Sequence, residues 1–227
     1  MLISVIIPCR NGENYLSEAV AGIRRQKLPV EIIVVDDGST DKTACLAESA
    51  GCRVMRHEAR RGQVAGKNTG IRAANGNYVM FHDHDDMMNA GALSTLYNKL
   101  VAGEDLWLVM AKVRDFLSPE LSKIRKQDIA ATIKKEPYYG LFTGAVLMRK
   151  ALFDRVGFFD ENLNTGEIIS LLTKMDKIHL QYKKIDFVAC NRRIHMTNYG
   201  RTDTAKEYKD YSAVLRAGLF SEMRGSK

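Results

Sequence analysis

Short apolar runs and helically spaced apolar residues alternate along the first part of the chain. The runs have the composition of strands, and the first two are continuous and mostly β-branched, which is typical of strands buried on both faces. These predicted strands cover residues 3–7, 31–35, 52–57 and 78–81. Between them, the helical repeat predicts helices over 13–26, 42–50 and 63–74. The alternation predicts parallel βαβ units, and therefore an α/β fold with a Rossmann-like, doubly wound, mostly parallel sheet that has helices on both faces.

The pattern is less regular after about residue 91. Further helices are predicted over 92–102, 151–156 and 166–177, and further strands within 106–116 and over 185–189. The segment 118–137 is rich in lysine and weakly helical, and 138–149 has the apolar content of a strand or a loop. Because no repeat or low-complexity linker interrupts the chain, we expect one domain over 1–200, followed by a helical tail over 201–227.

Polar and acidic residues follow several of the predicted strands. Arg10 and Asn11 follow the first, Asp36 and Asp37 follow the second, and the cluster 83–86 follows the fourth. In such sheets ligands bind outside the carboxyl ends of the strands, so these side chains are expected to share one site. A carboxylate after the second strand can accept a hydrogen bond from the ribose hydroxyl or the base N–H of a nucleotide. The alternative is that these residues only form an Asp-Gly turn. The first strand lacks a following glycine-rich fingerprint, which disfavours a nicotinamide dehydrogenase.

The segment His82-Asp83-His84-Asp85-Asp86 concentrates carboxylates at the end of the fourth predicted strand. Carboxylates two positions apart on a strand point the same way and can converge on one cation. Hard divalent ions prefer oxygen ligands and commonly keep phosphate oxygens among them. The alternative is a solvated turn before a helix, where aspartate is favoured by the helix dipole. We expect a site for Mn²⁺ or Mg²⁺ together with a nucleotide diphosphate.

The composition is that of a globular protein with a moderate basic excess. The chain has 227 residues and a formal charge of +7. No zinc-finger spacing, helix-turn-helix pattern or RNA-recognition signature is present, so we expect no nucleic-acid partner. The four cysteines form no CxxC pair, which predicts free, mostly buried thiols in a reducing compartment. No apolar run has the length of a signal peptide or a spanning helix, and we expect a cytoplasmic protein.

One basic segment is a candidate for peripheral membrane contact. It consists of Lys123-Ile124-Arg125-Lys126 together with Lys134-Lys135. Such a segment can meet an anionic membrane surface or an anionic acceptor, and the simpler alternative is a solvated face.

Three blocks of the first ninety residues combine these motifs in a recognisable order. They are Ser4-Val5-Ile6-Ile7-Pro8-Cys9-Arg10-Asn11, then Val34-Val35-Asp36-Asp37-Gly38-Ser39-Thr40-Asp41, then Lys67-Asn68-Thr69-Gly70-Ile71 followed by Gly76 to Asp86. In order and spacing they resemble glycosyltransferase family 2, and looser matches extend the resemblance to roughly residues 2–200. The resemblance implies the GT-A fold and transfer of a sugar from a nucleotide donor with inversion at the anomeric carbon. Residues 1–90 would form the nucleotide-sugar-binding half, and 91–200 the acceptor-side half.

The resemblance also implies roles for individual residues. The residues expected at the nucleotide donor are Pro8, Arg10, Asn11, Glu13, Asp37, Lys67, Asp83 and His84. Among these, Asp37 would recognise the base, and Lys67 would lie near the base or the phosphates. Asp85 is the preferred metal ligand. The family commonly has a leucine and a small residue at the positions of His82 and His84. These histidines either add a ligand or have an outer or exposed role, and the second alternative is favoured.

A second basic and imidazole-containing segment follows the last predicted strand. His195 lies where many relatives have an Arg-x-His segment, and it is expected to complete the metal shell or to bind the diphosphate. Arg192 and Arg193 are candidates for phosphate contact through their forked donors. The alternative is a surface loop with incidental basic residues.

Inverting transfer needs a general base that takes a proton from the acceptor hydroxyl. The family places this base in a Glu-Asp pair at the start of a helix, and its second acid generally acts as the base. Here Glu167 keeps the first acid, but Ile168 replaces the second. Three interpretations remain: Glu167 is the base, Asp160 or Glu161 substitutes for it, or the protein is catalytically weak. We favour Glu167.

The leading hypothesis is a metal-dependent, inverting glycosyltransferase that uses a nucleotide diphosphate sugar, most often a UDP-sugar in this family. The acceptor is open and includes a glycan, a lipid-linked molecule or a peptide. The alternative is a nucleotide-sugar-binding pseudoenzyme or a partner-binding module. A nucleotidyltransferase is disfavoured, since that class usually has a glycine-rich basic loop after the first strand.

Overall fold

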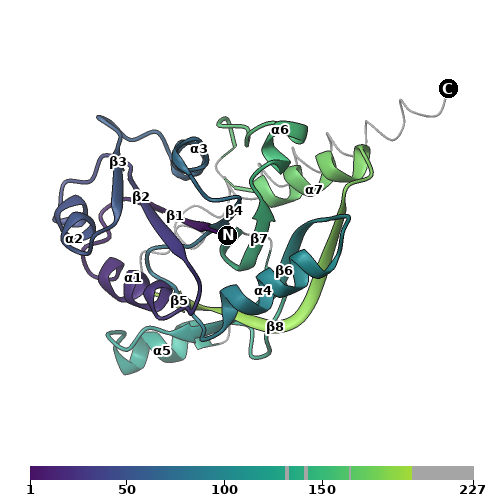
Figure 1. The fold of residues 1–227 in the computed structure, drawn as a ribbon. Helices are drawn as coiled ribbons and strands as arrows, with labels where there is room; N and C mark the ends of the chain where they lie inside the picture. Colours follow the sequence, from purple (N-terminus) through teal and green to yellow (C-terminus); the bar gives the residue numbers. More distant parts are fainter. Residues whose placement is uncertain (131–132, 141–142, 164, 196–227) are drawn as a thin grey trace.

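An eight-stranded sheet organises the part of the chain that the structure describes. The computed structural model describes residues 1–130, 133–140, 143–163 and 165–195, so the predicted tail over 201–227 lies outside it. The strands are β1 (Ile3–Cys9), β2 (Val30–Asp36), β3 (Arg53–Arg56), β4 (Tyr78–Phe81), β5 (Met87–Met88), β6 (Leu106–Leu117), β7 (Val146–Arg149) and β8 (Gln181–Ile194). They lie in the order β3-β2-β1-β4-β7-β6-β8-β5 (Figure 1).

The first half of the sheet confirms the predicted βαβ pattern. β3, β2, β1 and β4 pair in parallel, and every residue of β1 is buried. The connecting helices are α1 (Leu16–Arg24), α2 (Thr43–Ser49) and α3 (Gln63–Ala73). Parallel pairing places the carboxyl ends of β1, β2 and β4 at one edge, so the loops that follow them are neighbours.

The second half of the sheet is mixed and differs from the prediction in two strands. β7 lies antiparallel between β4 and β6, whereas β8 runs parallel to β6. β5, which pairs with β8, was not predicted, because two residues are too few to show a pattern. β8 begins at Gln181, before the predicted strand over 185–189. Its first residues were not predicted because they include the exposed Lys183 and Lys184 and lack an apolar pattern.

Helices cover both faces of this sheet, as predicted (Figure 1). The remaining helices are α4 (Ala92–Ala102), α5 (Lys123–Ala130), α6 (Leu152–Val156) and α7 (Glu167–Lys177), with a 3-10 turn, η1 (Thr143–Ala145), before β7. One core contains apolar residues of α1 and α4, and a second contains residues of α3, α6 and α7. A Cβ at Gly70 of α3 would lie 2.2 Å from Cγ2 of Ile6, so α3 packs on β1 more closely than a larger residue allows.

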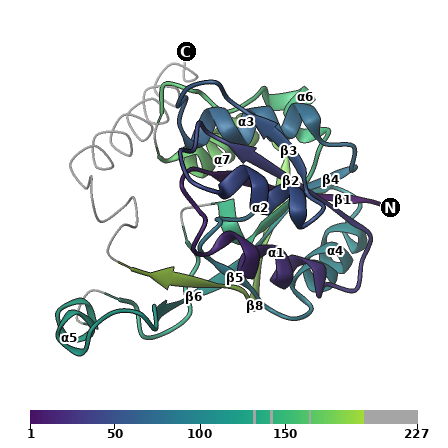
Figure 2. The same cartoon turned by 90° about the vertical axis from the view of Figure 1, so that its left-hand side faces the viewer.

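The ends of β6 and β8 extend away from the rest of the sheet and carry α5 (Figure 2). On the inner side of this extension, the side chains of Leu121, Ile129 and Ile194 form a small buried apolar cluster. On the outer side Ile124 is 71% exposed, between the exposed Lys123 and Arg125. The basic segment singled out in the sequence therefore lies at the surface, next to the end of β8.

The cysteines are free, as predicted. Cys9, Cys52 and Cys190 are buried, and Cys45 is exposed. Among the described residues, no helix combines the length and the apolar content that a membrane span requires.

Candidate active site

The acidic cluster begins where β4 leaves the sheet. The backbone N–H of His82 donates to the carbonyl of Ile6 at 2.9 Å, which extends the pairing with β1 by one residue. The His82 ring is fully buried, and its Nε2 lies 3.3 Å from the carbonyl oxygen of Asp86. Burial lowers the pKa of His82 to about 4, so its ring is neutral at pH 7. A ring buried this fully supports the turn from within and does not reach a ligand.

Asp85 and His195 come together from distant parts of the chain. Asp85 lies in the turn after β4, His195 directly follows β8, and Nε2 of His195 lies 2.8 Å from Oδ2 of Asp85. Burial favours the neutral carboxyl group of Asp85. The hydrogen bond with His195 and the charges of His84 and His195 outweigh that effect and lower the pKa of Asp85. The two residues predicted to bind metal are therefore in direct contact.

The other carboxylates of the cluster have different surroundings. Asp83 is half-buried, and its Oδ1 accepts a hydrogen bond from Nε2 of Gln63 at 3.0 Å. Asp86 is buried, and its Oδ1 accepts from the backbone N–H of Arg193 at 2.9 Å. Burial, together with repulsion from Asp85 and Asp83, raises the pKa of Asp86 well above its usual range. Asp86 thus ties the turn to β8, and Asp83 and Asp85 are the less buried carboxylates.

Asp85 and His195 fit a divalent ion as a pair of ligands. In the described ranges, no set of three or more His, Cys, Asp or Glu side chains is arranged to hold a metal. A carboxylate oxygen and an imidazole nitrogen are both ligands that Mn²⁺ accepts, and Mn²⁺ and Mg²⁺ commonly take further ligands from water and substrate phosphates. The residues present therefore suit an ion that is shared with a bound diphosphate.

A buried ion pair connects α3 with α7. Nζ of Lys67 in α3 donates to Oε1 of Glu167, the first residue of α7. The residues are 2% and 4% exposed, respectively. Within the described residues, Oε2 of Glu167 accepts no hydrogen bond. The geometry places the Lys67 ammonium at Glu167, and its predicted contact with the base or the phosphates stays a prediction.

Ile168 points into the core. It is fully buried among the apolar residues of α3, α6 and α7. An acid at this position, where the family has its second carboxylate, would be surrounded by apolar side chains here. At the start of α7, the carboxylate with a polar partner is therefore that of Glu167, which is paired with Lys67.

The two substitute bases proposed from the sequence lie before α7. Both oxygens of Glu161 are engaged, since Oε1 accepts from Nδ2 of Asn68 at 3.0 Å and Oε2 accepts from Nη2 of Arg61 at 3.1 Å. Asp160 is exposed, and its Oδ1 accepts from the backbone N–H of Asn162 at 3.0 Å. The hydrogen-bond partners of these two acids therefore differ from that of Glu167, which is paired with Lys67.

The loops after β1 and β2 are bonded to each other, as their shared sheet edge requires. The backbone N–H of Asn11 donates to Oγ of Ser39 at 2.9 Å, and Oδ1 of Asn11 accepts from the Thr40 N–H at 3.0 Å. Arg10 and Glu13 are exposed. The predicted nucleotide-binding residues of the loop after β1 therefore lie at the surface, whereas Pro8, which belongs to β1, is buried.

His84 packs against this loop. A Cβ at Gly12 would lie 2.6 Å from Cδ2 of His84 and 2.3 Å from Sγ of Cys9, so only glycine fits there. The ring of His84 is half-buried. The structure thus brings the acidic cluster to the loop after β1, as a shared site requires.

Asp37 is held by the loop that precedes α3. Its Oδ1 lies 2.8 Å from Nδ1 of His57 and accepts from the Arg61 N–H at 2.7 Å, and its Oδ2 accepts from the Gly62 N–H at 2.8 Å. Burial raises the pKa of Asp37, but these hydrogen bonds outweigh it, so that the pKa lies below its usual value. A carboxylate fixed in this way is charged and oriented.

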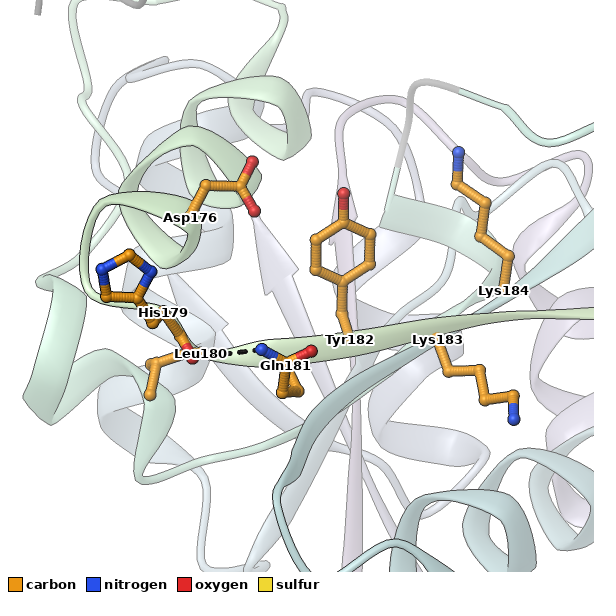
Figure 3. A pocket seen from close by; sticks show the side chains of 7 residues that line it. All are labelled: Asp176, His179, Leu180, Gln181, Tyr182, Lys183 and Lys184. Carbon is orange, nitrogen blue, oxygen red and sulfur yellow. Dashed lines mark hydrogen bonds between the residues drawn. The ribbon is translucent and has the colours of Figure 1, made fainter. Parts of the chain in front are cut away.

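A separate cavity of about 560 Å³ lies beyond the C-terminal end of α7 (Figure 3). Its lining residues are Asp176, His179, Leu180, Gln181, Tyr182, Lys183 and Lys184. None of the predicted site residues is among them. The chemistry of the predicted site is therefore gathered at the sheet edge, not in this cavity.

Known structures share the fold of this chain. TarS of S. aureus, solved in complex with UDP-GlcNAc, superposes with a TM-score of 0.72 at 20% identity, covering 96% of this chain and 65% of that one. A mannosyltransferase from Pyrobaculum calidifontis, solved with GDP-Man and Mn²⁺, gives a TM-score of 0.71 at 20% identity, covering 99% and 65%. At these identities the likeness shows the fold alone. Together with the observed sheet, it confirms the predicted GT-A architecture.

Sequence relatives are also glycosyltransferases by name. An uncharacterized glycosyltransferase, EpsJ, of Bacillus subtilis is 31% identical over 73% of this chain, and the match spans 53% of that protein. GalNAc(5)-diNAcBac-PP-undecaprenol beta-1,3-glucosyltransferase of Campylobacter jejuni is 35% identical over 99% of this chain and 76% of its own. The sequence model of the family described as glycosyl transferase family 2 matches residues 4–159. The chain belongs to glycosyl transferase family 2.

Proposed function

We propose that this protein transfers a sugar from a nucleotide diphosphate donor, a UDP-sugar, to a hydroxyl acceptor with inversion, and that the reaction requires Mn²⁺ or Mg²⁺. The observation that most supports the proposal is the contact between Asp85 and His195 at the carboxyl edge of the sheet. A carboxylate and an imidazole from separate elements meet there, beside the loops that follow β1 and β2.

Asp85 and His195 would hold the metal ion in this proposal. When bound, the ion offsets the charge of the diphosphate leaving group. The solved neighbours support a nucleotide-sugar donor, since one holds UDP-GlcNAc and the other holds GDP-Man with Mn²⁺. Asp83, half-buried beside Asp85, would face the donor sugar and its phosphates.

The nucleoside would lie over the loops after β1 and β2. The Asp37 carboxylate is fixed and charged, so that it is suited to accept a hydrogen bond from an N–H group of the nucleotide base. The remaining residues proposed to border the nucleotide are Pro8, Arg10, Asn11, Glu13 and His84. The exposed Arg10 adds a positive charge where an anionic ligand would approach.

Glu167 would act as the general base. Direct displacement requires a group that removes the proton of the acceptor hydroxyl as that oxygen attacks the anomeric carbon. The Glu167 carboxylate has one oxygen held by Lys67, while the second accepts no hydrogen bond within the described residues. The second oxygen is therefore the one proposed to take the proton.

A second candidate function is nucleotide-sugar binding without turnover. The buried Ile168 favours it, because the acid that generally serves as base in the family is missing from this chain. This alternative keeps all of the donor site and removes only the proton transfer.

The acceptor is proposed to be a hydroxyl of a glycan, free or linked to a lipid. The Campylobacter jejuni relative, which by its name acts on an undecaprenol-linked glycan, supports this class. The exposed Ile124 and its basic neighbours lie close to the end of β8 and are compatible with an acceptor at a membrane surface. The cytoplasmic location predicted from the sequence stays a prediction.

Purified protein should release UDP from UDP-sugars in the presence of Mn²⁺, slowly without an acceptor and faster with one. Chelation of the metal with EDTA should stop the release, because the diphosphate would lose its counter-charge. The measurement is a coupled assay of free UDP over a panel of UDP-sugars. Release that continues unchanged in EDTA would contradict metal dependence, whereas binding without any release would favour the second candidate.

A further inference from the structure

Arg193, near the end of β8, is a buried arginine whose Nε, Nη1 and Nη2 atoms each donate to a protein group. The residue is 4% exposed. Its Nε donates to the carbonyl oxygen of Asp85 at 2.9 Å, its Nη1 to Oγ of Ser118 at 3.3 Å, and its Nη2 to Oε2 of Glu18. The guanidinium group therefore joins α1, the turn after β4 and the segment after β6.

Two aromatic rings enclose the same guanidinium group. Its Cζ lies 5.0 Å from the ring centre of Tyr15 and 4.8 Å from that of Phe116. A delocalised cation is attracted to aromatic faces, and the attraction is stronger where water is excluded. The rings and the hydrogen bonds together restrict Arg193 to one orientation.

The groups that Arg193 contacts are those that place the two candidate metal ligands. It holds the main chain of Asp85 through Nε, and its own backbone N–H donates to Oδ1 of Asp86 at 2.9 Å. His195 is two residues further along, and its ring centre lies 5.0 Å from that of Tyr15. The Tyr15 ring thus contacts both the Arg193 cation and the His195 imidazole.

We propose that Arg193 is a positioning residue that holds Asp85 and His195 at the separation needed to share one divalent ion. The inference rests on the proposed function, because it concerns the same site. Outer groups that orient metal ligands commonly control affinity, and their loss weakens metal binding by about 10- to 100-fold. A lysine could not replace Arg193, since an ammonium lacks the planar fork that reaches the Asp85 carbonyl, Ser118 and Glu18 together.

This role differs from the phosphate contact predicted for Arg193. The structure directs its guanidinium donors to Asp85, Ser118 and Glu18, and the side chain is enclosed by Tyr15. A phosphate ligand would have to displace these partners. The two roles give different results when Mn²⁺ and UDP are measured separately, because a phosphate contact affects UDP and not the free ion.

The test measures binding of Mn²⁺, alone and with UDP present, by electron paramagnetic resonance, and binding of UDP by calorimetry with and without Mn²⁺. Arg193→Met and Arg193→Lys should both weaken Mn²⁺ binding by about 10- to 100-fold. Arg114→Met is the matched control, because Arg114 is an exposed arginine on the neighbouring strand β6. This control should bind Mn²⁺ as the wild type does.

Glu18→Gln provides a second variant in case the Arg193 variants do not fold. Glu18 has a side chain that is 49% exposed, so its replacement is compatible with folding, and it should weaken Mn²⁺ binding to a smaller extent. Unchanged Mn²⁺ affinity in folded Arg193 variants, or in Glu18→Gln if those variants do not fold, would overturn the inference and leave the proposed function standing. Wild-type protein that binds no Mn²⁺, alone or with UDP, would overturn both.

Discussion

Replacing Asp85 with asparagine should lower the rate of sugar transfer by at least about 1000-fold, which corresponds to about 4 kcal/mol of transition-state stabilisation. The substitution keeps the size of the side chain and removes its charge. Asp85 is the carboxylate in contact with His195, so the change removes the charged half of the proposed metal pair. Neutral amide oxygens bind hard divalent ions more weakly than carboxylates do. The measurement is UDP release at saturating donor and Mn²⁺.

Asp186→Asn is the matched control for this substitution. Asp186 is a carboxylate of β8 with a side chain that is 85% exposed, and it pairs with Lys112 away from the acidic cluster. Its replacement should leave the rate within about twofold, since exposed ion pairs contribute little. If Asp85→Asn were as active as Asp186→Asn, the assignment of Asp85 as the metal ligand would be wrong.

Glu167→Gln should reduce kcat by about 100- to 10,000-fold and leave the affinity for UDP unchanged. Glutamine still accepts a hydrogen bond from Lys67 through its carbonyl oxygen, so the connection between α3 and α7 is retained. What the variant loses is the carboxylate that would take the acceptor proton. Single-turnover kinetics together with calorimetry separate the two effects.

Glu161→Gln and Asp160→Asn are the comparisons that decide between the candidate bases. Both acids precede α7, and neither contacts Lys67 in the structure. Each should keep most of the activity if Glu167 is the base. Loss of kcat in one of these variants, with normal turnover in Glu167→Gln, would move the role to that residue. Absence of turnover in the wild type would favour nucleotide-sugar binding alone.

The first half of the fold was predictable because three of its strands, β1, β2 and β4, are mostly buried. A strand such as β1, with every residue in the core, has to be continuously apolar, and that pattern is visible without any tertiary information. The later strands were harder to predict. β5 has two residues, and the first part of β8 is exposed and lysine-rich, so neither has an apolar pattern of useful length.

The site was predictable where it depends on strand ends, and less so where it depends on packing between distant elements. The acidic cluster after β4 and the residues after β1 and β2 lie at one edge because parallel pairing places them there. Lys67 was expected near the base or the phosphates, and its pairing with Glu167 depends on how α7 packs on α3. A lysine in a helical pattern gives no sign of such a partner.

Arg193 shows the same limit at the end of β8. The sequence placed it two residues before His195, which could have suggested a shared strand face and a common environment. Its contacts with Glu18 and Ser118 join residues that are 175 and 75 positions away, and no local pattern reveals them. The proposed positioning role therefore comes from the structure alone.

The most direct test of the central claim is calorimetric titration of the wild-type protein with UDP, with Mn²⁺ and again with EDTA. If Asp85 and His195 hold an ion shared with the diphosphate, UDP should bind saturably at a single site with Mn²⁺, and its affinity should fall at least about tenfold in EDTA. Equal affinity in both conditions would contradict a metal-mediated diphosphate site, and no binding in either would contradict nucleotide recognition by this chain.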